Sequence, residues 1–326
     1  MTLGKNRPRL VVPLIRKSLL LHFVWILTSA LLYSQSPLTL PDSGLVNVNG
    51  TRLFVRTMGK GPAILFVHGG PGLDHSYFLP QMARLARSHR LIFYDQRACG
   101  RSSVDVDSST ITLNAFVEDI EALRKAANLG KLNLLGHSWG GLLAMLYARQ
   151  YPQNLASLLL VNTTPASTKA RNASFAVMQN RTTPEDSIAL AGIVSTTAFR
   201  ERNPAIMATF FRLLFKGAFC DRRYADSLTF AFSDNLPKTS ALMKYLALDP
   251  SATTYDITQD LKRITCPTLI VGGACDLVSA DALEEIHSHV KGSRVVILRN
   301  AGHFPYIESA DSFFPAVEQF LHDAGQ

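Results

Sequence analysis

The run Gly136-His137-Ser138-Trp139-Gly140 constrains the fold more than any other feature of the sequence. It directly follows the apolar residues Leu132 to Leu135, and a helical pattern begins just after it. A G-x-S-x-G run between a strand and a helix is typical of a tight turn that lifts the serine hydroxyl clear of a parallel sheet. A side chain at either glycine would collide with such a turn. We therefore predict that Ser138 is a nucleophile at the positive end of a helix dipole.

Apolar β-type runs alternate with helical segments along the chain, which predicts an α/β fold with a mostly parallel sheet covered on both faces. Asn49-Gly50 separates the first two runs and predicts a tight hairpin. The later strands are expected to be buried. Strands are expected at 45–48, 52–57, 63–67, 91–94, 132–135, 156–161, 268–271 and 294–298, amphipathic helices at 114–128 and 142–151, and a closing helix at 309–323.

Residues 163–262 interrupt this alternation, because they contain helical stretches broken by prolines and no strand pattern. Ligands of open α/β sheets bind at the carboxyl edge of the strands. We therefore predict that this insertion is a cap that shapes a substrate pocket; a second independent helical domain is the alternative, which insertion in mid-sheet disfavours. The predicted organisation is an N-terminal targeting segment at 1–36, a core at 37–162 and 263–326, and the cap at 163–262.

The formal net charge of +8 does not indicate nucleic-acid binding, because much of it lies at the N-terminus. Five basic residues precede the first acidic residue, and 28 basic and 25 acidic residues follow them, a balance of +3. No nucleic-acid partner is therefore expected. The five are Lys5, Arg7, Arg9, Arg16 and Lys17.

An uncharged run from Ser18 to Ser36 follows these basic residues, as in an export signal. Its apolar part, Leu19 to Tyr33, has 15 residues and is short for a membrane span, which favours a cleaved signal peptide. No clean small-x-small cleavage site follows, so an uncleaved anchor that attaches the chain to a membrane is the alternative. An ordinary N-terminal helix would need a polar face, which this run lacks. Either interpretation predicts an exported protein, whether secreted, periplasmic or anchored.

Sequons and cysteines give weaker indications. Asn49, Asn162, Asn172 and Asn180 each begin an N-x-S/T sequon, a glycan site if the host glycosylates. The four cysteines are too few for a disulfide scaffold and lack metal-type spacing. Cys266 and Cys275 flank one expected strand, too far apart to bridge, so free and partly buried thiols are expected.

A serine hydroxyl needs a base to take its proton and a carboxylate to orient that base. His303 follows the strand at 294–298, and Asp276 follows the strand at 268–271, so both should lie at the same edge of the sheet as Ser138. The chain order Ser, Asp, His is the order that strand-turn-helix serine hydrolases use. We predict Ser138, Asp276 and His303 as the catalytic residues.

Other candidates for these roles are weaker. His287 and His289 fall within an expected helix and are better explained as surface groups. Asp281 is the fallback acid, although it begins that helix and is better explained as its cap. Asn162, after the strand at 156–161, carries no charge and could orient a histidine only weakly.

The oxyanion formed when a serine attacks a carbonyl needs backbone N–H donors. His68-Gly69-Gly70-Pro71-Gly72 follows the strand at 63–67 and exposes backbone without side chains. We assign the donors to Gly70 and to Trp139, the residue after the nucleophile. A simple turn is the alternative for this glycine run, and His68 is expected to fix the loop by hydrogen bonding.

Three motifs together identify a resemblance: HGGPG at 68–72, YDQRACGRS at 94–102 and GHSWGG at 136–141. From Leu45 to the C-terminus the chain resembles the α/β-hydrolases related to proline iminopeptidase. The resemblance implies the α/β-hydrolase fold and release of an N-terminal residue, often proline, from a short peptide. It further implies an acyl-enzyme route that uses neither metal nor cofactor.

Two departures from this family leave the substrate open. The first is Ala98, which stands where the family has a glycine. The second lies in the cap, because the family holds the substrate amine with cap glutamates near tryptophans. The cap of this chain has no tryptophan, and its only glutamates are Glu185 and Glu201. A carboxylesterase or lactonase acting on small esters is therefore the alternative substrate class. A non-catalytic binding protein could share the fold, but packing does not demand Ser138, Asp276 and His303 together. Epoxide hydrolases and dehalogenases share the fold but use an aspartate as the nucleophile, so Ser138 argues against both classes.

Overall fold

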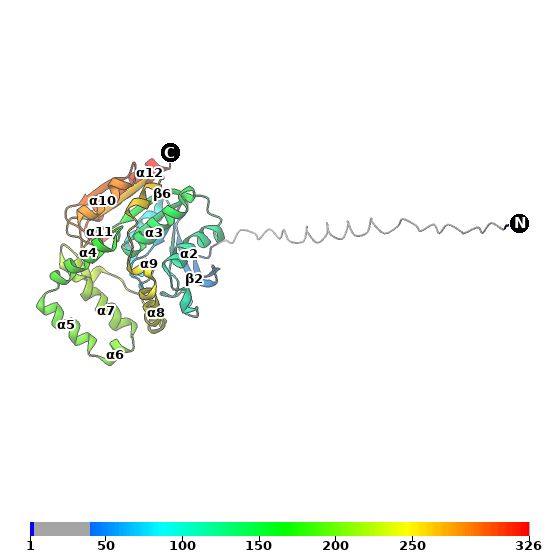
Figure 1. Cartoon of the computed structure of the whole chain (residues 1–326). Coiled ribbons are helices and arrows are strands. Elements are labelled where there is room, and N and C mark those ends of the chain that lie inside the picture. Colours follow the sequence, from blue (N-terminus) through cyan, green and yellow to red (C-terminus); the bar gives the residue numbers. More distant parts are fainter. Residues whose placement is uncertain (3–39, 326) are drawn as a thin grey trace. The chain divides into compact units, whose positions relative to one another are not determined.

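A computed structural model describes residues 1–2 and 40–325, and residues 40–325 belong to one compact unit. A sheet runs through this unit (Figure 1). It has eight strands in the order β1-β2-β4-β3-β5-β6-β7-β8. β1 pairs with β2 and β2 with β4 in antiparallel fashion, and the other pairs are parallel, as expected. The strands are Ser43–Val48 (β1), Thr51–Met58 (β2), Ala63–Val67 (β3), Arg90–Tyr94 (β4), Leu132–His137 (β5), Leu155–Val161 (β6), Thr268–Gly273 (β7) and Arg294–Leu298 (β8).

The turn between β1 and β2 is formed by Asn49 and Gly50, with φ of 45° and 71°. Asn and Gly tolerate this left-handed conformation, which gives a two-residue turn the twist of its strands. The hairpin predicted from these two residues is confirmed.

Helices cover both faces of the sheet. One face packs against α2 (Leu113–Ala126), α3 (Trp139–Gln150) and α10 (Ala280–His289), and the other against α12 (Ala310–Ala324) and the 3-10 turns between His75 and Arg87. Neighbouring strand residues alternate between the two cores, as Leu134 and Leu135 of β5 do. The buried strands therefore read as continuous apolar runs.

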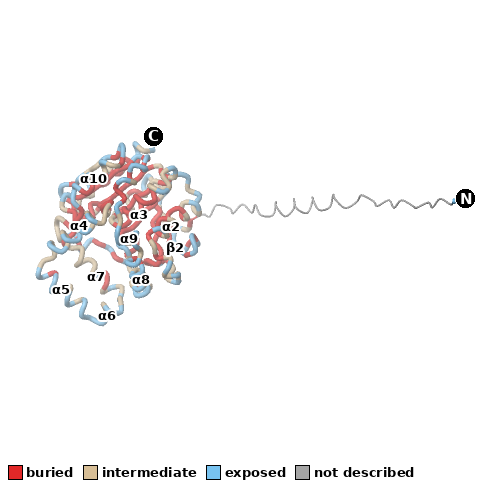
Figure 2. The backbone as a smooth tube through the Cα atoms, viewed as in Figure 1, coloured by how far each residue is buried: buried red, intermediate tan, exposed pale blue. Residues whose placement is uncertain are grey.

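Two elements differ from the sequence-based expectation. α3 begins at Trp139, three residues early, and is buried on all sides from Trp139 to Ala148, so it is not amphipathic (Figure 2). β8 was expected to be buried, but it is the edge strand, and only Leu298 at its end is buried. An apolar run alone does not tell a central strand from an edge strand, which depends on the order of strands in the sheet.

Between β6 and β7 the chain leaves the sheet and forms the helices of the predicted cap (Figure 1). α5, α6 and α7 pack on one another, and α4 joins this group to the core. The helices are α4 (Thr168–Arg181), α5 (Pro184–Val194), α6 (Thr197–Arg200), α7 (Pro204–Leu214), α8 (Leu236–Leu242) and α9 (Pro250–Thr253).

The targeting segment predicted at 1–36 lies, apart from its first two residues, outside the described residues. Within the described part of the chain, no helix has both the length and the apolar character needed to cross a bilayer.

Cys220 of the cap and Cys275 of the core form a disulfide, so the expectation of four free thiols is wrong for these two. Cys99 and Cys266 are free and buried, and Cys266 does not pair with Cys275, as expected. The length of a strand separates Cys266 from Cys275 but sets no distance between Cys220 and either of them. Cap packing brings Cys220 to Cys275 across a separation of 55 residues, which sequence spacing does not reveal.

Candidate active site

Ser138 sits at the sharp turn between β5 and α3, with φ of 54° and ψ of −122°. Its N–H donates to the carbonyl of Val161 in β6 (3.1 Å). A Cβ on Gly136 would lie 2.4 Å from the carbonyl oxygen of Gly140, and a Cβ on Gly140 would lie 2.0 Å from that of Val67. Both glycines are therefore required by close backbone contact, and the strained turn projects Ser138 from the end of β5.

Asp276 and His303 meet at the same edge of the sheet. His303 Nδ1 donates to Asp276 Oδ1 (2.7 Å), and the two residues are only 6% and 5% exposed, respectively. The other carboxylate oxygen of Asp276 accepts a hydrogen bond from Asn162 Nδ2 (2.7 Å), which also donates to the carbonyl of Gly302 (2.9 Å). Asn162 thus orients the carboxylate and the loop that carries His303, rather than the imidazole itself.

The fallback residues lie elsewhere. Asp281 is exposed on α10, and Ser279 caps this helix by accepting a hydrogen bond from the N–H of Ala282, so the expectation that Asp281 is the cap is wrong. Ser279 precedes the helix in extended conformation, as an N-cap must, whereas Asp281 lies within the first turn. His287 and His289 lie on α10, where they bind Ser293 and the carbonyl of Glu285.

The predicted oxyanion donors both border the cavity that contains Ser138. Trp139 is the first residue of α3, and N–H groups in the first turn of a helix have no intrahelical partner. Gly70 adopts φ of 132°, a conformation that side-chain-bearing residues rarely adopt. Gln96 links the two segments, since its Nε2 donates to the carbonyl of His68 (2.6 Å) and its Oε1 accepts from Trp139 Nε1 (3.2 Å).

His68 fixes the glycine loop, as its sequence position suggested. Its Nδ1 donates to the carbonyl of Gly69 (2.8 Å), and its Nε2 accepts the N–H of Gln96 (3.0 Å). Burial lowers the pKa of His68 from 6.5 to about 4, against the opposing charge of Asp95. A proton on Nε2 would remove the acceptor that Gln96 needs, so this imidazole acts as a neutral structural group.

Tyr77 and His137 connect the two loops, a role that the sequence analysis missed. The Tyr77 hydroxyl accepts the N–H of Gly69 (2.5 Å) and donates to His137 Nδ1 (2.9 Å). His137 Nε2 then donates to the carbonyl of His303 (2.9 Å). Burial, followed by the nearby His303, holds the pKa of His137 well below its usual value. His137 could have been noticed within the G-x-S-x-G run, but nothing in the sequence marks Tyr77.

Asp95 of the YDQRACGRS motif holds together the segment after the glycine run and the motif itself. Asp95 accepts hydrogen bonds from His75 Nδ1 (2.6 Å) and from the N–H of Arg101 (2.8 Å). Burial alone would raise the pKa of Asp95, but the hydrogen bond and charge of His75, together with smaller contributions such as the N–H of Arg101, outweigh burial and lower it. Ala98 adopts φ of 59°, so it occupies a left-handed position where a glycine is less strained.

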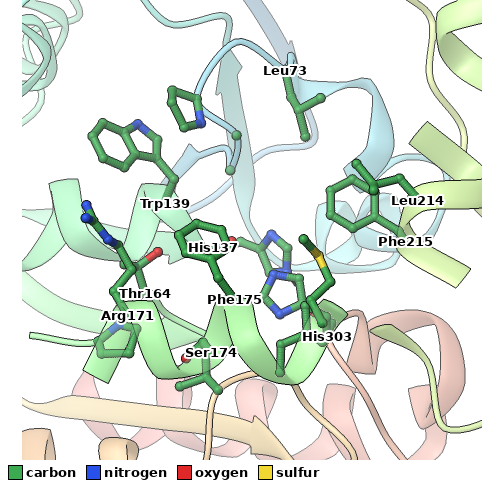
Figure 3. Close-up of a pocket in the computed structure, with 18 of the residues that line it drawn as sticks. Leu73, His137, Trp139, Thr164, Arg171, Ser174, Phe175, Leu214, Phe215 and His303 are labelled. Carbon is green, nitrogen blue, oxygen red and sulfur yellow. The ribbon is translucent and has the colours of Figure 1, made fainter. Parts of the chain in front are cut away.

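A cavity of about 450 Å³ opens beside Ser138, between the sheet edge and the cap. Phe175 of α4, Leu214 and Phe215 supply much of its apolar wall, and His303 reaches it from the core (Figure 3). Among the described residues that line it there is no aspartate, glutamate or lysine, and Arg171 is the only side chain with a permanent charge. In the described part of the chain, no group of three His, Cys, Asp or Glu side chains could hold a metal ion.

Comparison with known proteins agrees with this architecture and confirms the resemblance derived from the three motifs. The family model described as "alpha/beta hydrolase fold" matches residues 62–310. A proline iminopeptidase of Saccharolobus solfataricus is 29% identical over 306 residues, covering 86% of this chain and 92% of the relative.

Solved structures share the fold as well. An esterase of Thermogutta terrifontis has a TM-score of 0.64 at 24% identity, over 88% of this chain and 100% of that structure. An enol-lactonase of Burkholderia xenovorans has a TM-score of 0.59 at 22% identity, over 86% of this chain and 100% of that structure. The family match spans more than half of the sequence, and the chain belongs to the α/β-hydrolase family.

Proposed function

We propose that this chain is a serine hydrolase that forms an acyl-enzyme on Ser138, with His303 as the base, Asp276 as the residue that orients it, and Gly70 and Trp139 as oxyanion donors. Its substrate is a carboxylic ester or lactone that carries no ammonium group. The hydrogen bond from His303 Nδ1 to Asp276 Oδ1 supports the catalytic part of this proposal.

This hydrogen bond fixes the imidazole tautomer. With the proton on Nδ1 held by Asp276, the Nε2 lone pair is free to accept the Ser138 proton. Ser138 Oγ attacks the carbonyl carbon, and the N–H groups of Gly70 and Trp139 stabilise the negative oxygen. The bond to the leaving oxygen then breaks, and His303 returns its proton to the departing alcohol. Water, deprotonated by His303, hydrolyses the acyl-enzyme.

The residues that line the cavity favour an ester or lactone over a peptide with a free amine. An aminopeptidase must hold a substrate ammonium, and a buried ammonium needs a carboxylate partner. No carboxylate occurs among the described residues lining this cavity, and Arg171 would repel an ammonium there. Glu185 and Glu201, the only glutamates of the cap, are both exposed and do not line it. The aromatic and aliphatic side chains favour an apolar acyl chain without an ammonium group instead.

Aminopeptidase activity is the second candidate, and the sequence relatives favour it. The likeness to the Saccharolobus solfataricus proline iminopeptidase spans most of both chains. A prolyl substrate has a compact apolar ring that this cavity could accept. Its secondary amine would have to bind in the unprotonated form, or remain protonated and hydrated by solvent at the mouth of the cavity.

A matched substrate panel tests the proposal. Neutral short-chain p-nitrophenyl esters should be hydrolysed with a kcat/KM at least tenfold above that for the p-nitroanilides of proline and alanine with free amines. Fluorophosphonate should label the wild type but not Ser138→Ala, whose circular dichroism should be unchanged. Preferred cleavage of prolyl anilide would support the aminopeptidase instead, and labelling of Ser138→Ala would overturn the nucleophile assignment.

We further propose that the protein is exported. The basic N-terminus and uncharged run support this, and disulfides such as Cys220–Cys275 persist in oxidising compartments. Asn49, Asn172 and Asn180 are exposed and could carry glycans, whereas Asn162 is fully buried and could not. Expressed in a secretory eukaryotic host, the full chain should enter the secretory pathway and a chain lacking residues 1–36 should remain cytosolic. Cytosolic retention of both would refute export.

A further inference from the structure

Arg171 is the one side chain with a permanent charge among the described residues that line the mainly apolar cavity. It projects from α4 close to Trp139 and Thr164 (Figure 3). Its Nη1 donates to the carbonyl of Ala252 (2.9 Å) and its Nη2 to that of Thr253 (3.2 Å), while the guanidinium lies 5.3 Å from the ring centroid of Tyr255. These neutral contacts fix its position without neutralising its charge.

The charge of Arg171 has no counter-charge in the described part of the chain. The twelve ion pairs found there all involve other residues, and no carboxylate pairs with Arg171. Its Nε is buried and has no hydrogen-bond partner among the described residues, although the side chain as a whole is only half-buried. A donor and a charge left unmatched beside an apolar cavity are costly unless a ligand satisfies them.

We infer that Arg171 binds a carboxylate of the substrate, so that the preferred substrate joins a reactive carbonyl to a free carboxylate through an apolar spacer. A guanidinium matches a carboxylate in shape and charge, and the pair is strong where water is partly excluded. Ser174, one helical turn after Arg171, and Thr164 place hydroxyl groups on the same wall. The inference rests on the proposed function, because it assumes that acyl transfer occurs at Ser138.

A carboxylate at this position could come from two sources. In a half-ester of a dicarboxylic acid, it belongs to the acyl group. In a prolyl dipeptide, it is the C-terminus of the leaving residue. The two sources share the same recognition chemistry, and separate substrate pairs distinguish them.

The first pair is the p-nitrophenyl half-ester of glutaric acid and the p-nitrophenyl ester of pentanoic acid, which have equal chain lengths. The second pair is Pro-Ala and its C-terminal amide. Wild type should favour the anionic member of at least one pair by roughly ten- to hundredfold in kcat/KM. Arg171→Met should lose that preference, so that the ratio of kcat/KM between the anionic and the neutral member falls to about one. Arg171→Lys, which keeps the charge but not the fork of donors, should retain part of it.

Lys169→Met is the matched control, because it removes one positive charge from an exposed position of the same helix outside this cavity. It should leave both ratios unchanged. An equal fall for charged and neutral substrates in Arg171→Met would mean that the side chain only supports α9, and would overturn the inference.

A wild-type preference for the neutral member of both pairs would also overturn it, and this measurement needs no variant to fold. Fluorophosphonate labelling of Ser138 is measured in parallel. Labelling without carboxylate preference would refute the role of Arg171 alone, whereas absence of labelling would refute the proposed function.

Discussion

Cys220 in the cap is joined by a disulfide to Cys275, the residue directly before Asp276. Nearby, Arg181 of α4 donates to the carbonyl of Cys275, and the N–H of His303 donates to the carbonyl of Ala218 (2.7 Å). The cap is therefore bound directly to both loops that carry Asp276 and His303. Movement of the cap and alignment of these two residues should be coupled.

Replacing both Cys220 and Cys275 by serine should lower the free energy of unfolding by roughly 2–4 kcal/mol, because a cross-link across 55 residues restricts the unfolded chain. The rate of fluorophosphonate labelling should fall as well. Denaturant unfolding and labelling kinetics provide the two measurements. Thiol titration of the unfolded wild type should find two free thiols before reduction and four after it, and four before reduction would rule out the bond.

Replacing Asp276 by asparagine should lower kcat by roughly 10⁴-fold, because the amide favours the wrong tautomer of His303 and cannot stabilise its charged form. Asp281→Asn is the control, since Asp281 is exposed on α10, and it should leave kcat unchanged. Steady-state kinetics on a neutral ester tests both. A larger loss in Asp281→Asn than in Asp276→Asn would reverse the assignment.

Asn162→Ala should reduce kcat by roughly 10–100-fold with little effect on KM, because Asn162 holds the Asp276 carboxylate and the Gly302 carbonyl but does not line the cavity. Asn162→Asp keeps the shape but places a second negative charge beside Asp276, and it should raise the pKa seen in the pH–rate profile. A pH–rate profile identical to wild type would show that Asn162 acts only in packing.

Much of the fold could be predicted from the sequence because its apolar runs are bounded by strong turn formers. The Asn49-Gly50 turn, the strand before Gly136 and the interruption after Val161 are local patterns, and all are recognisable without tertiary contacts. The edge position of β8 and the complete burial of α3 depend on how the elements assemble, so local patterns did not reveal them.

The residues of the candidate site likewise fall into those that a local sequence pattern indicates and those that only tertiary packing brings into place. Ser138, Asp276 and His303 each follow a strand, and parallel strands end at one edge, so their proximity could be expected. Tyr77 reaches His137, Asn162 reaches Asp276 and Cys220 reaches Cys275 across 60, 114 and 55 residues, respectively. Contacts over such separations arise from tertiary packing and leave no local pattern in the sequence.

Replacing Tyr77 by phenylalanine should slow the reaction, because the hydroxyl connects the Gly69 N–H to His137 and, through it, to the His303 carbonyl. We expect kcat to fall roughly 10–100-fold and the free energy of unfolding to drop by roughly 1–3 kcal/mol. Tyr94→Phe is the matched control, since the buried Tyr94 hydroxyl has no hydrogen-bond partner among the described residues, and it should change neither quantity. Equal effects of the two substitutions would contradict the proposed connection.

The low pKa of His68 makes stability depend on pH in a defined direction. Its pKa is 6.5 unfolded and about 4 folded, so between these values the unfolded chain binds the proton more strongly and stability falls as pH falls. From about pH 7.5 to about pH 4.5, His68 should contribute a loss of roughly 2–3 kcal/mol.

Asp119 has the opposite effect on stability. Burial raises its pKa to about 6, although its pairing with Arg97 acts in the other direction. The folded chain therefore binds this proton more strongly than the unfolded chain, and Asp119 adds to stability as the pH falls. His68→Gln isolates the histidine, since Asp119 is common to both chains and glutamine can still accept the Gln96 N–H. The variant should therefore lose roughly 2–3 kcal/mol less than wild type in denaturant unfolding over that pH range. Parallel pH dependences of the two chains would mean that His68 is not held neutral by burial.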